Sequence, residues 1–114
     1  MATEQIQTFR ELLERERAWL LRTVVQTDDE LATLEAHQPG GPAEDATSEV
    51  MSTVLSRLEG REKHDLDEID AARARLEAGT FGACEACTRP IPLARLRARP
   101  ATRYCRDCQA RIER

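Results

Sequence analysis

The sequence predicts a mainly α-helical protein: a long antiparallel coiled-coil helical hairpin over residues 1–79, followed by a small four-cysteine finger over residues 80–114. Three observations predict this class. Of the 114 residues, 33% are charged and only 4% are aromatic, which suits long helices with a narrow apolar seam better than a thick globular core. Apolar residues recur every three or four positions through the first two thirds of the chain. The last third holds all four cysteines and is too short to build a second hydrophobic core.

The first helix is expected to span residues 3–36 without interruption, because this stretch contains neither glycine nor proline and is rich in good helix formers. At ~1.5 Å per residue, such a helix is roughly 50 Å long. Trp19 flanks the apolar seam, where packing explains it better than contact with a partner. The seam has a near-heptad spacing and consists of Ile6, Phe9, Leu13, Glu16, Leu20, Val24, Thr27, Leu31 and Leu34.

A Gln-Pro-Gly-Gly-Pro run at residues 38–42 then breaks the helical geometry. The second helix is expected to start near Asp45, Thr47 or Ser48 and to run to about Ala78, with Gly79 as the left-handed residue that ends it. This helix contains Gly60, which costs roughly 1 kcal/mol relative to alanine in a helix interior. Two long helices joined by a short break form an antiparallel hairpin, whose tip we place at about residues 37–46.

The strongest signal in the sequence is a pair of Cys-x2-Cys motifs, separated by seventeen residues and formed by Cys84, Cys87, Cys105 and Cys108. Two intervening residues let both sulfurs of a motif reach one cation at ~2.3 Å, and two such motifs complete a tetrahedron. This spacing is typical of a four-cysteine zinc ribbon or treble-clef-like finger. We therefore predict one structural Zn²⁺, which supplies folding energy and has no open position for catalysis.

Two alternatives compete with zinc at the four cysteines. Two disulfide bonds are disfavoured because the chain shows no secretion signal. A redox motif usually occurs once and near a βαβ pattern, which is missing here. Redox sensing through the same thiolates stays open as an additional role.

The charge distribution and the motifs narrow the functional classes. Residues 1–79 are net acidic, whereas residues 80–114 hold eight arginines against three acidic residues. No stretch approaches the roughly 18 consecutive apolar residues of a membrane span, and the first ten residues lack an apolar signal region, so we expect a cytoplasmic protein. No phosphate-binding loop or zinc-hydrolase motif is present, and neither His37 nor His64 belongs to a triad-like group, so enzymatic activity is not expected.

Three segments of the last third resemble one known family. They are LEAGTFGACEAC at residues 76–87, PIPLARLRARP at residues 90–100 and YCRDC at residues 104–108. Together they resemble the DksA/TraR zinc-finger family of bacterial transcription regulators. The preceding hairpin agrees in length and position, so the resemblance covers nearly the whole chain.

The resemblance implies a regulator that binds bacterial RNA polymerase directly rather than a specific DNA sequence. In this family the hairpin enters the secondary channel, its tip lies near the catalytic magnesium, and the zinc end holds the channel rim. Arg95, Arg97 and Arg99 are therefore candidate rim contacts, although a solvated basic face explains them equally well. We expect the chain to be a monomer.

The tip departs from the family pattern. Well-known members carry an aspartate, two further residues, a second aspartate, one residue and an alanine. An ungapped count back from the first zinc cysteine places Gly41 at the first acidic position and Glu44 at the second, with Asp45 beside it and Ala46 at the alanine. Glu44 and Asp45 either act near the polymerase active centre or stabilise the start of a helix by ~0.3–1 kcal/mol.

A second departure concerns guanosine tetraphosphate, which responsive members bind through basic residues. The same count places Arg61 at a basic position, but Glu68 and Gln109 where lysines are expected. A carboxylate repels the phosphates of the alarmone. The resemblance therefore implies a weak or absent response to this nucleotide.

Two other functions compete with a polymerase-binding factor. A zinc-ribbon nucleic-acid-binding protein would use the basic finger, although the acidic hairpin argues against it. A coiled-coil interaction protein would instead dimerise through the apolar seam, with the finger as a cap.

Overall fold

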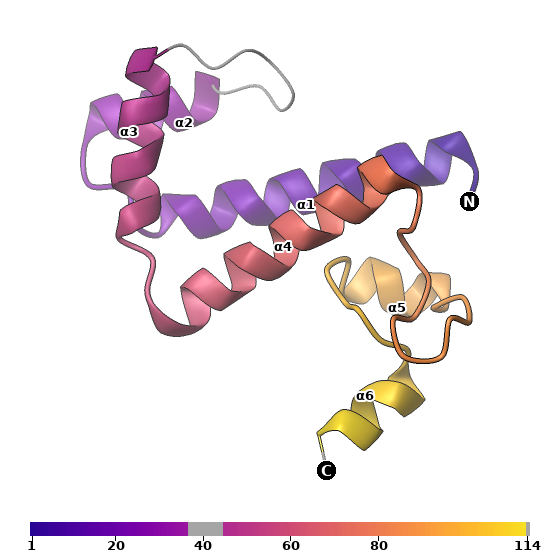
Figure 1. Cartoon of the computed structure of the whole chain (residues 1–114). Coiled ribbons are helices and arrows are strands. Elements are labelled where there is room, and N and C mark those ends of the chain that lie inside the picture. The colour runs from indigo at the N-terminus through magenta and orange to yellow at the C-terminus, as the bar shows by residue number, and fades with distance from the viewer. Residues whose placement is uncertain (37–44, 114) are drawn as a thin grey trace. The chain divides into compact units, whose positions relative to one another are not determined.

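The computed structural model describes residues 1–36 and 45–113, with only the backbone described for residues 45–48. Six helices form within these ranges, and a single isolated β-bridge joins Ala83 to Pro90 (Figure 1). The predicted mainly α-helical class is confirmed. The helices are α1 (Thr3–Arg22), α2 (Asp28–Ala36), α3 (Asp45–Ser56), α4 (Gly60–Ala78), α5 (Leu93–Ala98) and α6 (Arg106–Ile112).

The expectation of one uninterrupted helix over residues 3–36 is wrong, because the chain leaves helical geometry at residues 23–27. The Thr27 hydroxyl accepts a hydrogen bond of 3.1 Å from the amide of Glu30. The Glu30 carboxylate reaches back and accepts one of 2.9 Å from the amide of Gln26. This arrangement is close to a capping box, and it starts α2 as a separate helix.

The second long helix is also divided, at residues 57–59, so the continuous helix expected over residues 45–78 is wrong. Gly60 begins α4 with φ +55°, a left-handed conformation that favours glycine. It therefore marks a joint between helices rather than a weak point inside one. The expected end of α4 is confirmed: Gly79 has φ +77°, and the amide of Thr80 donates to the carbonyl of Arg75 at 2.9 Å, as in a Schellman motif.

The described chain divides into two compact units. We call residues 14–66 the tip unit, because they include the segment expected at the hairpin tip, and residues 1–13 with 67–114 the finger unit. In the tip unit, α2 and α3 contact each other. The buried apolar side chains of this unit are Leu20, Leu21, Leu34, Met51, Val54, Leu58 and Leu66.

Contacts between α1 and α4 have the sense expected of an antiparallel hairpin. In the finger unit, the Arg10 guanidinium near the start of α1 lies 3.1 Å from the Glu77 carboxylate near the end of α4. In the tip unit, the Thr23 hydroxyl just after α1 lies 3.3 Å from the Glu62 carboxylate near the start of α4. Trp19 of α1 is 68% exposed, so the expectation that it packs beside the seam is wrong.

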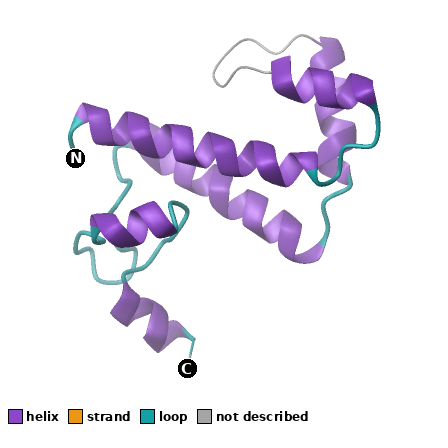
Figure 2. Ribbon diagram, turned by 180° about the vertical axis from the view of Figure 1, so that it is seen from behind, coloured by secondary structure: helices purple, strands orange, loops and turns teal. Residues whose placement is uncertain are grey.

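The finger shares its hydrophobic core with α1. Outside α5 and α6 it consists mostly of loops (Figure 2). Phe9 of α1 is buried in the same cluster as Ile91 and Leu96, and its ring centroid lies 5.2 Å from that of Phe81. The apolar seam of α1 therefore supplies a core residue that residues 80–114 lack.

Candidate metal centre

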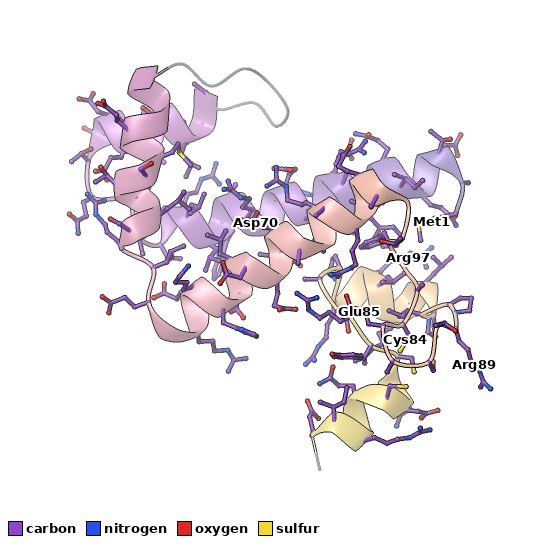
Figure 3. All side chains as sticks on the ribbon, in the orientation of Figure 1. Met1, Asp70, Cys84, Glu85, Arg89 and Arg97 are labelled. Atoms are coloured by element: carbon purple, nitrogen blue, oxygen red, sulfur yellow. The ribbon has the colours of Figure 1, made fainter. Side chains whose placement is uncertain are left out.

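The four predicted cysteine ligands come together in the structure. Their Sγ atoms all lie within 4.8 Å of one another, and those of Cys87 and Cys105 are 3.9 Å apart. A tetrahedron with zinc–sulfur bonds of ~2.3 Å has sulfur–sulfur edges of about 3.8 Å. The spacing, the number and the chemistry of the donors therefore fit one Zn²⁺ (Figure 3).

The first pair of ligands lies on a tight turn. The amide of Cys84 donates to the carbonyl of Arg89, and the amide of Thr88 donates to the carbonyl of Cys84, both at 2.9 Å. Thr88 takes a left-handed conformation with φ +66°, which lets the chain reverse directly after Cys87. The Arg89 side chain extends outward from this turn (Figure 3).

The second pair of ligands lies at the start of α6. Cys105 is the N-cap residue, and its carbonyl accepts a hydrogen bond of 2.9 Å from the amide of Gln109. Cys108 lies in the first turn and is buried. A helix N-terminus favours negative charge and so helps the sulfurs to bind as thiolates.

The pKa values of two thiols differ widely within the cluster. Burial opposes ionisation of Cys84, but hydrogen bonds from neighbouring backbone amides, that of Cys105 first, outweigh it and lower the pKa of Cys84 to about 6. The hydrogen bond with the Cys105 side chain and then burial raise the pKa of Cys108 to about 12. Crowded sulfurs cannot all ionise together, whereas a divalent cation supplies the charge that lets all four bind it.

A charged network ties the finger to α4. Arg103 donates to both carboxylate oxygens of Glu68 on α4, at 2.7 and 3.1 Å, and to Glu85 of the first Cys-x2-Cys turn at 3.1 Å. The hydrogen bond to Glu68, more than any other interaction, raises the pKa of Arg103. Arg75 of α4 lies 3.7 Å from the Glu85 carboxylate. The carboxylate that stands where the family pattern expects a lysine is therefore held by an arginine of the finger.

The three candidate rim arginines differ in their surroundings. Arg95 is half-buried, and its Nε donates a hydrogen bond of 3.0 Å to the carbonyl of Tyr104. This bond connects α5 to the backbone directly before the second Cys-x2-Cys motif. Arg97 and Arg99 are exposed. The structure thus gives Arg95 a supporting role within the finger and leaves the other two accessible.

The predicted tip residues lie partly outside the described part of the chain. Gly41 and Glu44 are not described, whereas Asp45 and Ala46 are the first residues of α3. Their role in the tip stays a prediction.

Sequence reasoning missed the ion pair between Glu30 and Arg57 in the tip unit. The Arg57 guanidinium donates to both oxygens of the Glu30 carboxylate, and one of these bonds is 2.7 Å long. Glu30 is only 8% exposed. The Thr27-Asp28-Asp29-Glu30 sequence carried the available signal, because threonine followed three residues later by glutamate is typical of a capping box.

Comparisons with known proteins assign the family. Residues 79–114 match the prokaryotic dksA/traR C4-type zinc finger. The chain is 32% identical over 120 residues to the RNA polymerase-binding transcription factor DksA of Haemophilus influenzae, covering 99% of this chain and 77% of the relative. The chain belongs to the DksA/TraR family. DksA of Escherichia coli K12 is likewise 32% identical over 117 residues, covering 99% of this chain and 74% of the relative.

A solved structure agrees with the family assignment. The structure of transcription factor DksA2 from Pseudomonas aeruginosa matches with a TM-score of 0.65 and 34% identity, over 99% of this chain and 86% of that one. Membership of a C4-type zinc-finger family and the four clustered sulfurs are consistent with one structural zinc ion. Among the described residues, none of the helices is both long and apolar enough to cross a lipid bilayer.

Proposed function

We propose that this DksA/TraR protein binds bacterial RNA polymerase directly and regulates the initiation of transcription. The observation that carries the proposal is 32% identity, over nearly the whole chain, to proteins named RNA polymerase-binding transcription factors. On this proposal the hairpin of residues 1–79 enters the secondary channel, and the finger of residues 80–114 anchors the protein outside it. The protein acts in the cytoplasm as a monomer, without recognising a DNA sequence and without catalysing a reaction.

The surface of the finger suits a role in anchoring. Arg97 and Arg99 are exposed on and just after α5, and residues 80–114 are net basic. Exposed guanidinium groups favour an acidic protein surface as partner. We assign the rim contact to these two arginines, whereas Arg95 supports the finger from within.

The tip residues Glu44, Asp45 and Ala46 are the proposed effectors in the channel. Removing the carboxylates of Glu44 and Asp45 is expected to leave polymerase binding intact, because the finger supplies the anchor. The effect on promoter complexes is expected to change, because two negative charges near a magnesium-dependent active centre alter its electrostatics.

We further propose a weak or absent response to guanosine tetraphosphate. The Glu68 carboxylate is held by Arg103. The Gln109 side chain carries no positive charge and donates to Glu113 at 3.0 Å. Neither position therefore offers a free cation to a phosphate.

The test is in vitro transcription with the matched polymerase, with and without guanosine tetraphosphate. Wild type is compared with Glu44→Ala/Asp45→Ala and with the control Glu4→Ala/Glu11→Ala, which removes two exposed carboxylates from the finger unit. We expect the tip variant to compete with wild type for polymerase but to lose its effect on initiation, and the nucleotide to change little.

Three results would count against the proposal. Loss of both binding and activity in the tip variant would show that the tip anchors the protein. A protein that ignores core polymerase but binds duplex DNA with a steep salt dependence would be a nucleic-acid-binding protein instead. A stable dimer in sedimentation that cannot bind polymerase would indicate a coiled-coil interaction protein.

A further inference from the structure

Both helix breaks of the tip unit converge on the guanidinium group of Arg57. Arg57 itself lies in the second break, between α3 and α4. Its Nη1 donates a hydrogen bond of 3.0 Å to the carbonyl of Val24, which lies in the first break, between α1 and α2. Its Nη1 and Nη2 also donate to the two carboxylate oxygens of Glu30, in the first turn of α2. One side chain therefore connects two breaks that are far apart in the sequence.

Glu30 completes this connection on the side of α2. The carboxylate oxygen that accepts from Arg57 Nη1 also accepts from the amide of Gln26 at 2.9 Å. The amide of Glu30 is itself capped by the Thr27 hydroxyl at 3.1 Å. Residues 24–30 are thus held by a set of hydrogen bonds with defined directions, rather than by apolar packing alone.

The environment of the pair explains what it contributes. Among the described residues, Glu30 is the one charged or polar residue that is buried. The side chain of its partner Arg57 is 23% exposed. A pair taken out of water gains little net stability over apolar side chains of similar volume, because desolvation offsets the attraction. A bidentate guanidinium–carboxylate contact instead fixes the relative orientation of the two side chains, since both groups are planar. The pair is therefore better suited to set an angle between helices than to add stability.

We infer that Glu30 and Arg57 are positioning residues, which set the direction of α2 and α3 within the tip unit. This inference rests on the proposed function, in which the tip unit acts inside the polymerase. The finger is not involved, because all groups of the cluster belong to residues 14–66.

The deciding variant is Glu30→Met/Arg57→Met. It removes both charges together, so that no lone buried charge remains to unfold the unit. The matched control is Arg22→Met/Glu35→Met, which removes an exposed ion pair of 3.9 Å from the same unit. Arg57→Lys keeps the positive charge but loses the planar, bidentate contact with Glu30.

Three properties of each variant are measured: the melting temperature, amide hydrogen exchange, and transcription with matched polymerase. We expect the double methionine variant to melt within a few degrees of wild type and to compete for polymerase as wild type does. The amide of Gln26 loses its acceptor and should exchange about tenfold faster or more. The effect on transcription should fall at least about fivefold, Arg57→Lys should show an intermediate loss, and the control should behave as wild type.

The outcomes separate this inference from the proposed function. Unchanged exchange at Gln26 in the double methionine variant overturns the inference whatever transcription shows. Faster exchange with full transcriptional effect shows that the pair is only structural and also overturns it. A wild-type protein that neither binds polymerase nor affects transcription refutes the proposed function, and with it the functional half of the inference.

Discussion

The finger unit and the tip unit are stabilised by different kinds of interaction. In the finger unit, four sulfurs within 4.8 Å of one another organise loops and two short helices, and Phe9 of α1 completes a small core. In the tip unit, packed helices and one buried ion pair provide the order. The finger unit therefore depends on a metal ion, whereas the tip unit depends on helix ends and their hydrogen bonds. On the proposed function, a metal ion thus stabilises the anchor and polar contacts position the tip.

Removing a zinc ligand is expected to cause the largest loss of stability and to unfold residues 80–113 while leaving α2 and α3 folded. Cys84→Ser or Cys108→Ser leaves three ligands for a site whose metal contributes roughly 10 kcal/mol to folding. We expect zinc content, measured by atomic absorption, to fall to near zero and amide protection over residues 80–113 to be lost, while α2 and α3 keep theirs. Ala83→Ser is the control, because its side chain is exposed beside Cys84. A Cys84→Ser protein with full zinc and an unchanged melting temperature would contradict the role of the metal.

A second variant tests whether the finger needs α1. Phe9 is 2% exposed within the finger core, so Phe9→Ala should cost about 3–5 kcal/mol of unfolding free energy. Trp19→Ala removes a larger aromatic side chain from the same helix, but this side chain is 68% exposed and its loss should change stability by less than about 0.5 kcal/mol. Denaturant unfolding measures both. Equal costs for the two variants would show that the finger does not depend on Phe9.

A smaller effect is expected at the contact between the finger and α4. Arg103→Met removes the bonds to Glu68 and Glu85, all of which lie in partly exposed surroundings. Solvent screening limits the expected cost to about 1 kcal/mol, and the cost should shrink further in high salt. The exposed Arg111 provides the control as Arg111→Met. A cost that does not change with salt would indicate that packing rather than charge makes the contact.

A further prediction concerns how the stability of the tip unit depends on pH. The hydrogen bond from Arg57, before any other cause, lowers the pKa of Glu30 from 4.5 to about 2. Because the folded value lies below the unfolded value, the stabilisation is complete above pH 4.5 and disappears as the pH falls from there to about 2. The stability difference between wild type and Glu30→Gln should therefore be constant at neutral pH and shrink on acidification. Taking the difference cancels the loss of zinc that both proteins undergo in acid. A difference that stays constant down to pH 2 would show that folding does not change the pKa of Glu30.

The finger unit and the tip unit also differ in how much of their structure could be predicted from the sequence. The zinc ligands were predictable because two residues between cysteines are a local geometric requirement, which needs no knowledge of distant contacts. The end of α4 at Gly79 was predictable for the same reason, because the left-handed cap is local. These features belong to the finger unit.

The errors lie in the tip unit. The seam spacing predicted that the first helix continues through residues 23–27, because Val24 and Thr27 fall on the seam. The helix instead breaks there, and the hydrogen bonds of Thr27 and Glu30 start a new one. Gly60 was assigned to a helix interior although its conformation begins α4. The partner of Glu30 could not be predicted, because Arg57 becomes a neighbour only once both helices have broken. Spacing also placed Phe9 on a seam without showing that the seam extends into the finger core.

The most direct test of the central claim is cleavage of the bound protein by the polymerase active centre. Fe²⁺ is exchanged for the catalytic magnesium of the polymerase, so that hydroxyl radicals cut only the chain that lies nearby, and the fragments are mapped by mass spectrometry. A regulator that places its tip in the secondary channel predicts cuts concentrated within residues 37–46, which weaken when an excess of uncleavable competitor occupies the channel. Cuts within residues 80–113, or a stable complex that shows no cut near residues 37–46, would contradict the claim.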